Sequence, residues 1–70
     1  MSEKTEKPEV GSPEYYAAEA VAYRRAASRA HHQGDRYADR GHDRAAVRSW
    51  QEGRRLDALA DRYEELARKP

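Results

Sequence analysis

A chain of 70 residues forms at most one domain, and a single hydrophobic core of this size is marginally stable without further support. The sequence has no cysteine, which excludes disulfides and thiolate metal sites, and its formal net charge of +1 argues against a general polyanion binder. Residues 1–12 are too polar for a signal peptide and no apolar run approaches membrane-spanning length, so we expect a cytoplasmic protein without membrane contact.

The N-terminal segment, residues 1–11, alternates Glu and Lys and includes Pro8, Gly11 and a single Val10. A segment of this composition cannot bury enough apolar surface to order itself. We therefore predict a disordered charged tail over residues 1–11 and a helical domain over residues 12–70. A short docking segment is the alternative for the tail.

Two proline-free segments follow the tail. Ser12, followed by a proline and a glutamate, has the residue types of a helix start: an N-cap, a first helical position and an acidic first turn. Gly41 suits the left-handed residue expected after a helix end, and Asp43 is a second good N-cap. The sequence thus predicts an all-α fold, an antiparallel two-helix hairpin with long helices over about 13–40 and 43–68.

Small and apolar residues recur at steps of four and three along both predicted helices, as in a coiled-coil seam. The first stripe comprises Tyr16, Ala20, Tyr23, Ala27, Ala30, Gly34, Tyr37 and Gly41, and the second comprises Ala46, Trp50, Gly53, Leu56, Ala60, Tyr63 and Ala67. Folding the chain back at Gly41 places large residues opposite small ones, as interdigitated packing requires. The predicted facing pairs include Tyr37 with Ala46, Gly34 with Trp50, Ala30 with Gly53, Ala27 with Leu56 and Tyr23 with Ala60.

Gly34 and Gly53 fall inside the predicted helices, where each costs about 1 kcal/mol relative to alanine. The hairpin explains both, because Gly34 makes room for Trp50 and the layer at Gly53 lets the two backbones approach closely. The alternative is a three-helix arrangement, in which Gly34 and Asp35 end one helix and begin the next. The residues predicted to pack the hairpin are Tyr23, Gly34, Tyr37, Trp50, Gly53, Leu56 and Tyr63.

Around the turn, six residues follow a fixed order of side-chain types. They are a small residue, a tyrosine, a turn residue, an alanine, an aromatic and a small residue: Gly34, Tyr37, Gly41, Ala46, Trp50 and Gly53. Over residues 27–60 this spacing resembles one repeat of the tetratricopeptide family. It departs from the family at Ala30, Gln33 and Ala58, where tryptophan, leucine and proline are usual, and in its longer helices and single copy. The resemblance implies helix-hairpin packing and, by analogy, a protein-binding role.

Apolar residues off the predicted seam would remain exposed in a single hairpin. They concentrate toward the chain ends and comprise Tyr15, Ala18, Val21, Ala22, Leu59 and Leu66. A stripe of this length usually finds a partner. We therefore predict a small protein–protein interaction module, most simply a homodimer that completes a helical bundle, or an adaptor that docks on a larger protein.

The charges are distributed unevenly along the chain. Residues 1–23 carry two lysines and five acids (net −3), residues 24–55 nine arginines and four acids (net +5), and residues 56–70 three basic groups and four acids (net −1). The turn end is therefore predicted to be basic. Its arginines form either a solvated surface with helical ion pairs or a site for nucleic acid or an acidic surface, which is the alternative function. The candidate anion-binding tip comprises Arg29, Arg36, Arg40, Arg44 and Arg48.

No pattern of residues points to catalysis. The sequence has no glycine-rich phosphate loop, no nucleophile with an adjacent base and no acid pair in an apolar setting, so we expect no enzyme, no cofactor and no small-molecule substrate. His31 and Asp35 lie four residues apart and could share a metal ion, but the established zinc spacings are missing. We expect solvated, ion-paired histidines rather than a metal site.

Overall fold

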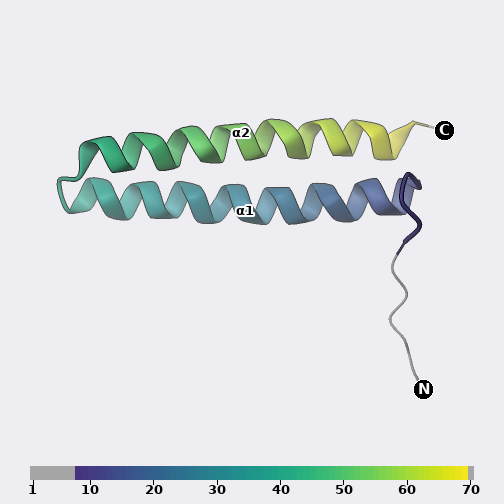
Figure 1. Cartoon of the computed structure of the whole chain (residues 1–70), viewed down its shortest axis with the longest axis horizontal. Helices are drawn as coiled ribbons and strands as arrows, with labels where there is room; N and C mark the ends of the chain where they lie inside the picture. The colour runs from purple at the N-terminus through teal and green to yellow at the C-terminus, as the bar shows by residue number, and fades with distance from the viewer. Residues whose placement is uncertain (1–7, 70) are drawn as a thin grey trace, which may run out of the picture.

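The computed structural model describes residues 8–69 and consists of two α-helices, α1 (Pro13–Asp39) and α2 (Asp43–Arg68). The helices lie side by side and antiparallel, joined by a short turn (Figure 1). Both are continuous through the glycines in their interiors, Gly34 and Gly53. The predicted hairpin is therefore confirmed, and the three-helix alternative is wrong.

The first helix begins at the predicted position. Ser12 is the N-cap, and its hydroxyl accepts a hydrogen bond of 3.1 Å from the backbone N–H of Tyr15. Pro13 occupies the first helical position, where its missing N–H costs no intrahelical hydrogen bond. Local residue types thus determine this end of α1.

Most of the predicted disordered tail, residues 1–11, lies outside the described residues. Its described part forms a turn in which the backbone N–H of Ser12 donates to the carbonyl of Glu9 at 3.0 Å. Gly11 has a φ of 90°, a conformation that glycine adopts at little cost. The last residues before the helix are therefore held in a defined bend.

A hydrogen-bonded glycine turn ends α1. The N–H of Gly41 donates to the carbonyl of Ala38 at 3.0 Å, and the N–H of His42 donates to the carbonyl of Tyr37 at 2.9 Å. Gly41 has a φ of 81°, the left-handed conformation that this pair of bonds requires. The rings of Tyr37 and His42 lie 6.2 Å apart between centroids, beside the closed turn. The predicted role of Gly41 is confirmed.

The predicted N-cap of α2 is wrong by one residue. His42 occupies the cap position without a side-chain hydrogen bond, and Asp43 is already the first helical residue. The reason is the turn, because the bond from the His42 N–H fixes that residue outside both helices and α2 starts immediately after it. Asp43 still places its carboxylate in the first turn, where the helix dipole favours negative charge.

The contact between the helices is narrow. Among the described residues the buried side chains are Ala20, Ala27, Ala46 and Ala60, and the two interior glycines are buried with them. The Cα atoms extend only 11 Å along the shortest axis, so the hairpin is a single layer of helices. Every larger apolar side chain in the described part of the chain therefore keeps part of its surface in contact with solvent.

Each interior glycine lies against a ring from the opposite helix. A Cβ added at Gly34 would overlap Cδ1 and Nε1 of Trp50, which confirms this predicted pair. At Gly53, predicted to face Ala30, an added Cβ would instead lie 2.7–2.8 Å from imidazole atoms of His31. The helices are rotated so that the longer His31 side chain, rather than the methyl group of Ala30, fills the space beside Gly53.

Candidate interaction surfaces

The single layer leaves two broad faces, and hydrogen bonds between helices define the first. The indole Nε1 of Trp50, on α2, donates to Asp35 on α1 at 3.1 Å. In the opposite direction, Nε2 of His31 on α1 lies 3.0 Å from Oδ2 of Asp57 on α2. Because an ionised carboxylate only accepts hydrogen bonds, this imidazole nitrogen carries the proton and donates it. Trp50 covers Gly34, and His31 covers Gly53. Each of these rings is therefore held by a carboxylate on the opposite helix.

Arg24 extends this network along α2. Its guanidinium donates to Asp57 at 3.0 Å, to Asp61 at 2.8 Å and to Glu64 at 2.9 Å. Hydrogen bonds to Asp61, Glu64 and Asp57 raise the pKa of Arg24 above its usual value. A hydrogen bond from His31, and then one from Arg24, lowers the pKa of Asp57. We call this surface the polar face; it comprises Arg24, His31, Asp35, Trp50, Asp57, Asp61 and Glu64.

Sequence reasoning missed most of the polar face. It predicted an ion-paired histidine, and His31 does have an acidic partner, but that partner lies on the other helix. Arg24 was assigned only to the basic segment. The signal available in the sequence was the spacing of Asp57, Asp61 and Glu64, which places three carboxylates on one side of α2.

The second face carries a row of tyrosines. The rings of Tyr23 and Tyr63 stack across the helix pair with centroids 5.4 Å apart and planes 6° apart. Tyr16 lies 5.9 Å from Tyr63 on its other side, and Tyr15 packs edge-on against Tyr16 at 5.6 Å. Electrostatic repulsion between the Tyr23 and Tyr63 phenolates, followed by burial, raises the pKa of the Tyr63 hydroxyl. The predicted packing roles of Tyr23 and Tyr63 agree with this contact.

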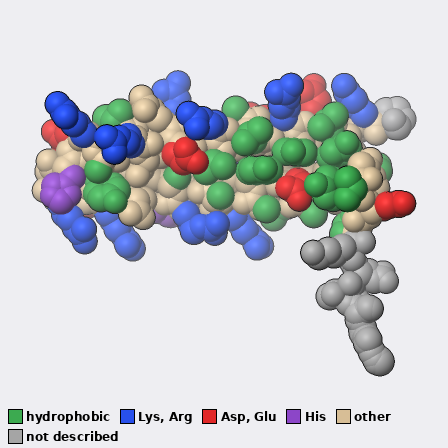
Figure 2. Space-filling model, in the orientation of Figure 1, with side chains coloured by type: hydrophobic (Ala, Val, Ile, Leu, Met, Phe, Trp, Pro, Cys, Tyr) green, Lys and Arg blue, Asp and Glu red, His purple; other side chains and the backbone are tan. Residues whose placement is uncertain are grey.

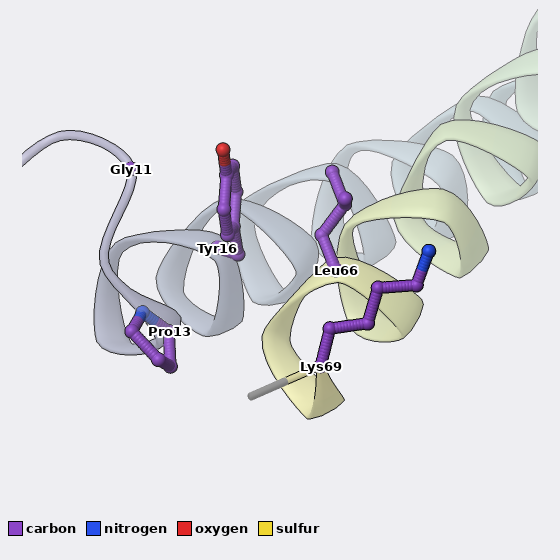
Figure 3. Close-up of a pocket in the computed structure, with 5 residues that line it drawn as sticks. All are labelled: Gly11, Pro13, Tyr16, Leu66 and Lys69. Carbon is purple, nitrogen blue, oxygen red and sulfur yellow. The ribbon is translucent and has the colours of Figure 1, made fainter.

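Leucines of α2 continue this surface. Leu59 and Leu66 lie four residues before and three after Tyr63, so helical geometry places all three on one side of α2. Figure 3 shows Leu66 and Tyr16 projecting in the same direction, beside a shallow hollow of about 330 Å³. We call this surface the tyrosine–leucine face; it comprises Tyr16, Tyr23, Leu56, Leu59, Tyr63 and Leu66.

The structure divides the six residues predicted as a self-association surface. Leu59 and Leu66 belong to the tyrosine–leucine face, and Tyr15 borders it through its contact with Tyr16. Ala18 and Ala22 are each two residues from the buried Ala20, so they lie on the side of α1 away from α2. Val21, which is 52% exposed, precedes Arg24 by three residues and lies toward the polar face. The prediction therefore identified three residues of one surface and three that lie elsewhere.

The five arginines predicted as an anion-binding tip do not form one cluster. Arg29 and Arg36 lie on the outer edge of α1, where they line a hollow of about 270 Å³ together with His32 and Gln33. Arg44 and Arg48 are each two residues from the buried Ala46, on the outer edge of α2, and Arg40 is in the turn. Figure 2 shows Lys and Arg side chains along both long edges of the hairpin. The basic charge is thus divided between opposite edges.

No other kind of site emerges from the described residues. Within residues 8–69 there is no group of three or more His, Cys, Asp or Glu side chains arranged to hold a metal ion. Neither α1 nor α2 combines the length and apolar composition needed to cross a membrane.

Comparisons with protein-family models, with curated proteins and with solved structures gave no match to this chain. The resemblance of residues 27–60 to a tetratricopeptide repeat therefore stays a prediction. Function has to be inferred from the two faces and the two edges of the hairpin.

Proposed function

We propose that this hairpin is a protein–protein interaction module that self-associates through the tyrosine–leucine face. The main support is that no described side chain larger than alanine is buried. Leucines normally fill a protein core, yet Leu56 and Leu59 are only half-buried and Leu66 is 37% exposed. A second copy placed on this face would cover them and complete a four-helix bundle.

The dimensions of the face suit a stable dimer. A helix of 26 residues, the length of α2, is about 40 Å long, and two adjacent helices of about 10 Å each give a width of about 20 Å. A flat contact over one whole side of the hairpin would bury about 800 Å² on each copy, which is the usual contribution of one partner to a standard interface. The side of the hairpin that carries the tyrosine–leucine face is therefore large enough for the proposed contact.

The experiment measures molar mass by sedimentation equilibrium at a low and a high protein concentration, for the parent chain and for two variants. At high concentration the parent should reach twice the chain mass of 8.1 kDa. Leu66→Glu places a charge in the proposed interface and should keep the chain monomeric. The matched control is Val47→Glu: Val47 is also an exposed apolar residue of α2, at 46%, but it lies three residues before Trp50, toward the polar face.

Two results would contradict the proposal. A parent chain that stays monomeric at high concentration removes self-association altogether. If Val47→Glu disrupts the dimer as strongly as Leu66→Glu, the chain associates through a different surface. Far-UV circular dichroism of each variant reports whether helix content changes together with the mass.

We propose nucleic-acid binding by the outer edge of α1 as a second candidate function. The supporting observation is the hollow lined by Arg29 and Arg36. Within residues 8–69, neither guanidinium has a carboxylate oxygen within 4.0 Å. Cations without internal partners are available for phosphates, and His32 and Gln33 add hydrogen-bond donors beside them. One edge of one helix offers few such contacts, so this candidate ranks below self-association.

Its test is titration of a labelled DNA duplex across a salt series. The double variant Arg29→Gln and Arg36→Gln should weaken binding and lower the salt slope by about one for each lost phosphate contact. Arg62→Gln, on the outer side of α2, is the matched control and should change little. Absence of binding at low salt, or equal loss in the control, would eliminate the edge of α1 as the site.

A further inference from the structure

The side of the hairpin that carries the tyrosine–leucine face differs in side-chain type between its two halves. Toward the chain ends this side carries Tyr16, Tyr23, Leu59, Tyr63 and Leu66, whereas toward the turn it carries Ala30, Gln33, Tyr37, Ala45, Ser49 and Glu52. Figure 2 shows hydrophobic side chains gathered in the half of the hairpin toward the chain ends. Large apolar side chains are therefore concentrated in the chain-end half of this side.

The charges follow the same division. Residues 8–23 contain three glutamates and no lysine or arginine (net −3), and residues 56–69 have a net charge of −1. Residues 24–55, which form the turn half, have a net charge of +5. The chain-end half of the hairpin as a whole is thus acidic and carries most of the large apolar side chains on this side, whereas the turn half as a whole is basic and carries fewer of them.

We propose that the two copies associate in antiparallel orientation, with the turn half of each hairpin covering the chain-end half of the other. This inference rests on the proposed self-association and specifies its geometry. The two-fold axis then runs across the helices near Ala26 of α1, and Tyr23 falls opposite Ala30 of the second copy. The same register places Tyr16 opposite Tyr37, and the acidic half of each copy lies on the basic half of the other.

The parallel orientation lacks this charge complementarity and pairs like halves of the two hairpins. It would place the two basic turn halves side by side, so that two regions of net charge +5 repel each other. It would also bring Tyr16, Tyr23 and Leu66 of both copies to the same end of the dimer. The charge distribution therefore favours the antiparallel orientation, and the concentration of large apolar side chains in one half agrees with it.

The chain has no cysteine, so a single introduced cysteine carries a spin label at one defined position. With a label at His42→Cys, in the turn, an antiparallel dimer should give an inter-label distance of about 40 Å, the length of one helix. A parallel dimer would instead give less than about 20 Å, because neighbouring helices in a bundle lie about 10 Å apart. Lys69→Cys, at the opposite end of the hairpin, should reproduce the long distance.

A short distance from either label, in a sample that sediments as a dimer, overturns the antiparallel orientation and leaves the proposed self-association intact. A monomeric mass together with no inter-label distance overturns both. Adding Leu66→Glu to each labelled variant should abolish the long distance, since it removes the contact that holds the copies together. Mass and distance thus separate failure of the orientation from failure of the self-association.

Discussion

The contact between Gly34 and Trp50 gives the sharpest test of the hairpin, through the substitution Gly34→Ala. In an isolated helix this change stabilises by about 1 kcal/mol, because glycine has the greater backbone freedom in the unfolded chain. Here the added methyl group would overlap Cδ1 and Nε1 of the indole. The ring is not free to swing away, because its Nε1 donates to Asp35, the residue next to Gly34, at 3.1 Å.

The two effects oppose each other, and their magnitudes decide the sign. Inserting a methyl group into a closely packed contact costs about 1–3 kcal/mol. Subtracting the gain in helix propensity leaves a net loss of about 0–2 kcal/mol for Gly34→Ala. Gly34→Leu adds much more volume at the same point and should prevent the two helices from closing at this level.

The assay is urea unfolding followed by far-UV circular dichroism, with all variants at one protein concentration because self-association would otherwise shift the midpoints. Fluorescence of Trp50, the single tryptophan, reports on the contact directly. The same substitution is then measured in a Trp50→Ala background. Without the indole, Gly34→Ala should stabilise the protein by about 1 kcal/mol, so the sign of its effect reverses.

The reversal of sign separates the contact with the indole from other causes of a stability change. If Gly34→Ala stabilises the parent as much as it stabilises the Trp50→Ala variant, the indole does not lie against Gly34. If it destabilises both backgrounds equally, the cost arises from something other than the ring. Either result would refute the explanation of why a glycine occupies the middle of α1.

Three further predictions concern the polar face and the turn. Arg24→Ala should lower the thermal midpoint of the parent chain, and this difference should shrink in high salt, because the lost contacts are partly exposed ion pairs. The pKa of Asp57 is lowered in the folded state, so its stabilising contribution is fully present above the unfolded-state value of 3.8 and is lost as pH falls through the folded-state pKa. Asp57→Asn should therefore flatten the acid limb of a curve of stability against pH. An unchanged acid limb would contradict this origin. Gly41→Ala should destabilise by about 1–2 kcal/mol in urea unfolding, because the φ of 81° is strained for any residue with a side chain, whereas Gly41→Asn should cost less.

The parts of the fold that the sequence predicted correctly depend on local or periodic signals. Ser12 and Pro13 define a helix start by their own chemistry, and Gly41 marks the turn because few other residues adopt its conformation. The alternating steps of four and three then set the register, which placed Gly34 opposite Trp50. Asp43 was assigned wrongly as a cap because the turn bond from His42 determines where the second helix begins.

Other features depend on how far each helix is rotated about its own axis, which the stripe of small residues defines only coarsely. That rotation brings His31 rather than Ala30 to Gly53 and directs Arg24 toward Asp57, Asp61 and Glu64. It also separates the arginines predicted as one tip, because residues two positions from a buried alanine point away from the partner helix. A charge count along the chain contains no such angular information.

The sequence by itself therefore determined that this protein is a helical hairpin, where it turns and which glycine receives the tryptophan. These properties follow from backbone preferences and from periodicity, and both act over short distances along the chain. Only the tertiary structure decided that the hairpin has one polar and one tyrosine–leucine face, because a face combines side chains of both helices. That combination is fixed by the narrow contact between the helices, which sets the rotation of each helix against the other. The residues buried in this contact are Ala20, Ala27, Ala46, Ala60 and the two interior glycines.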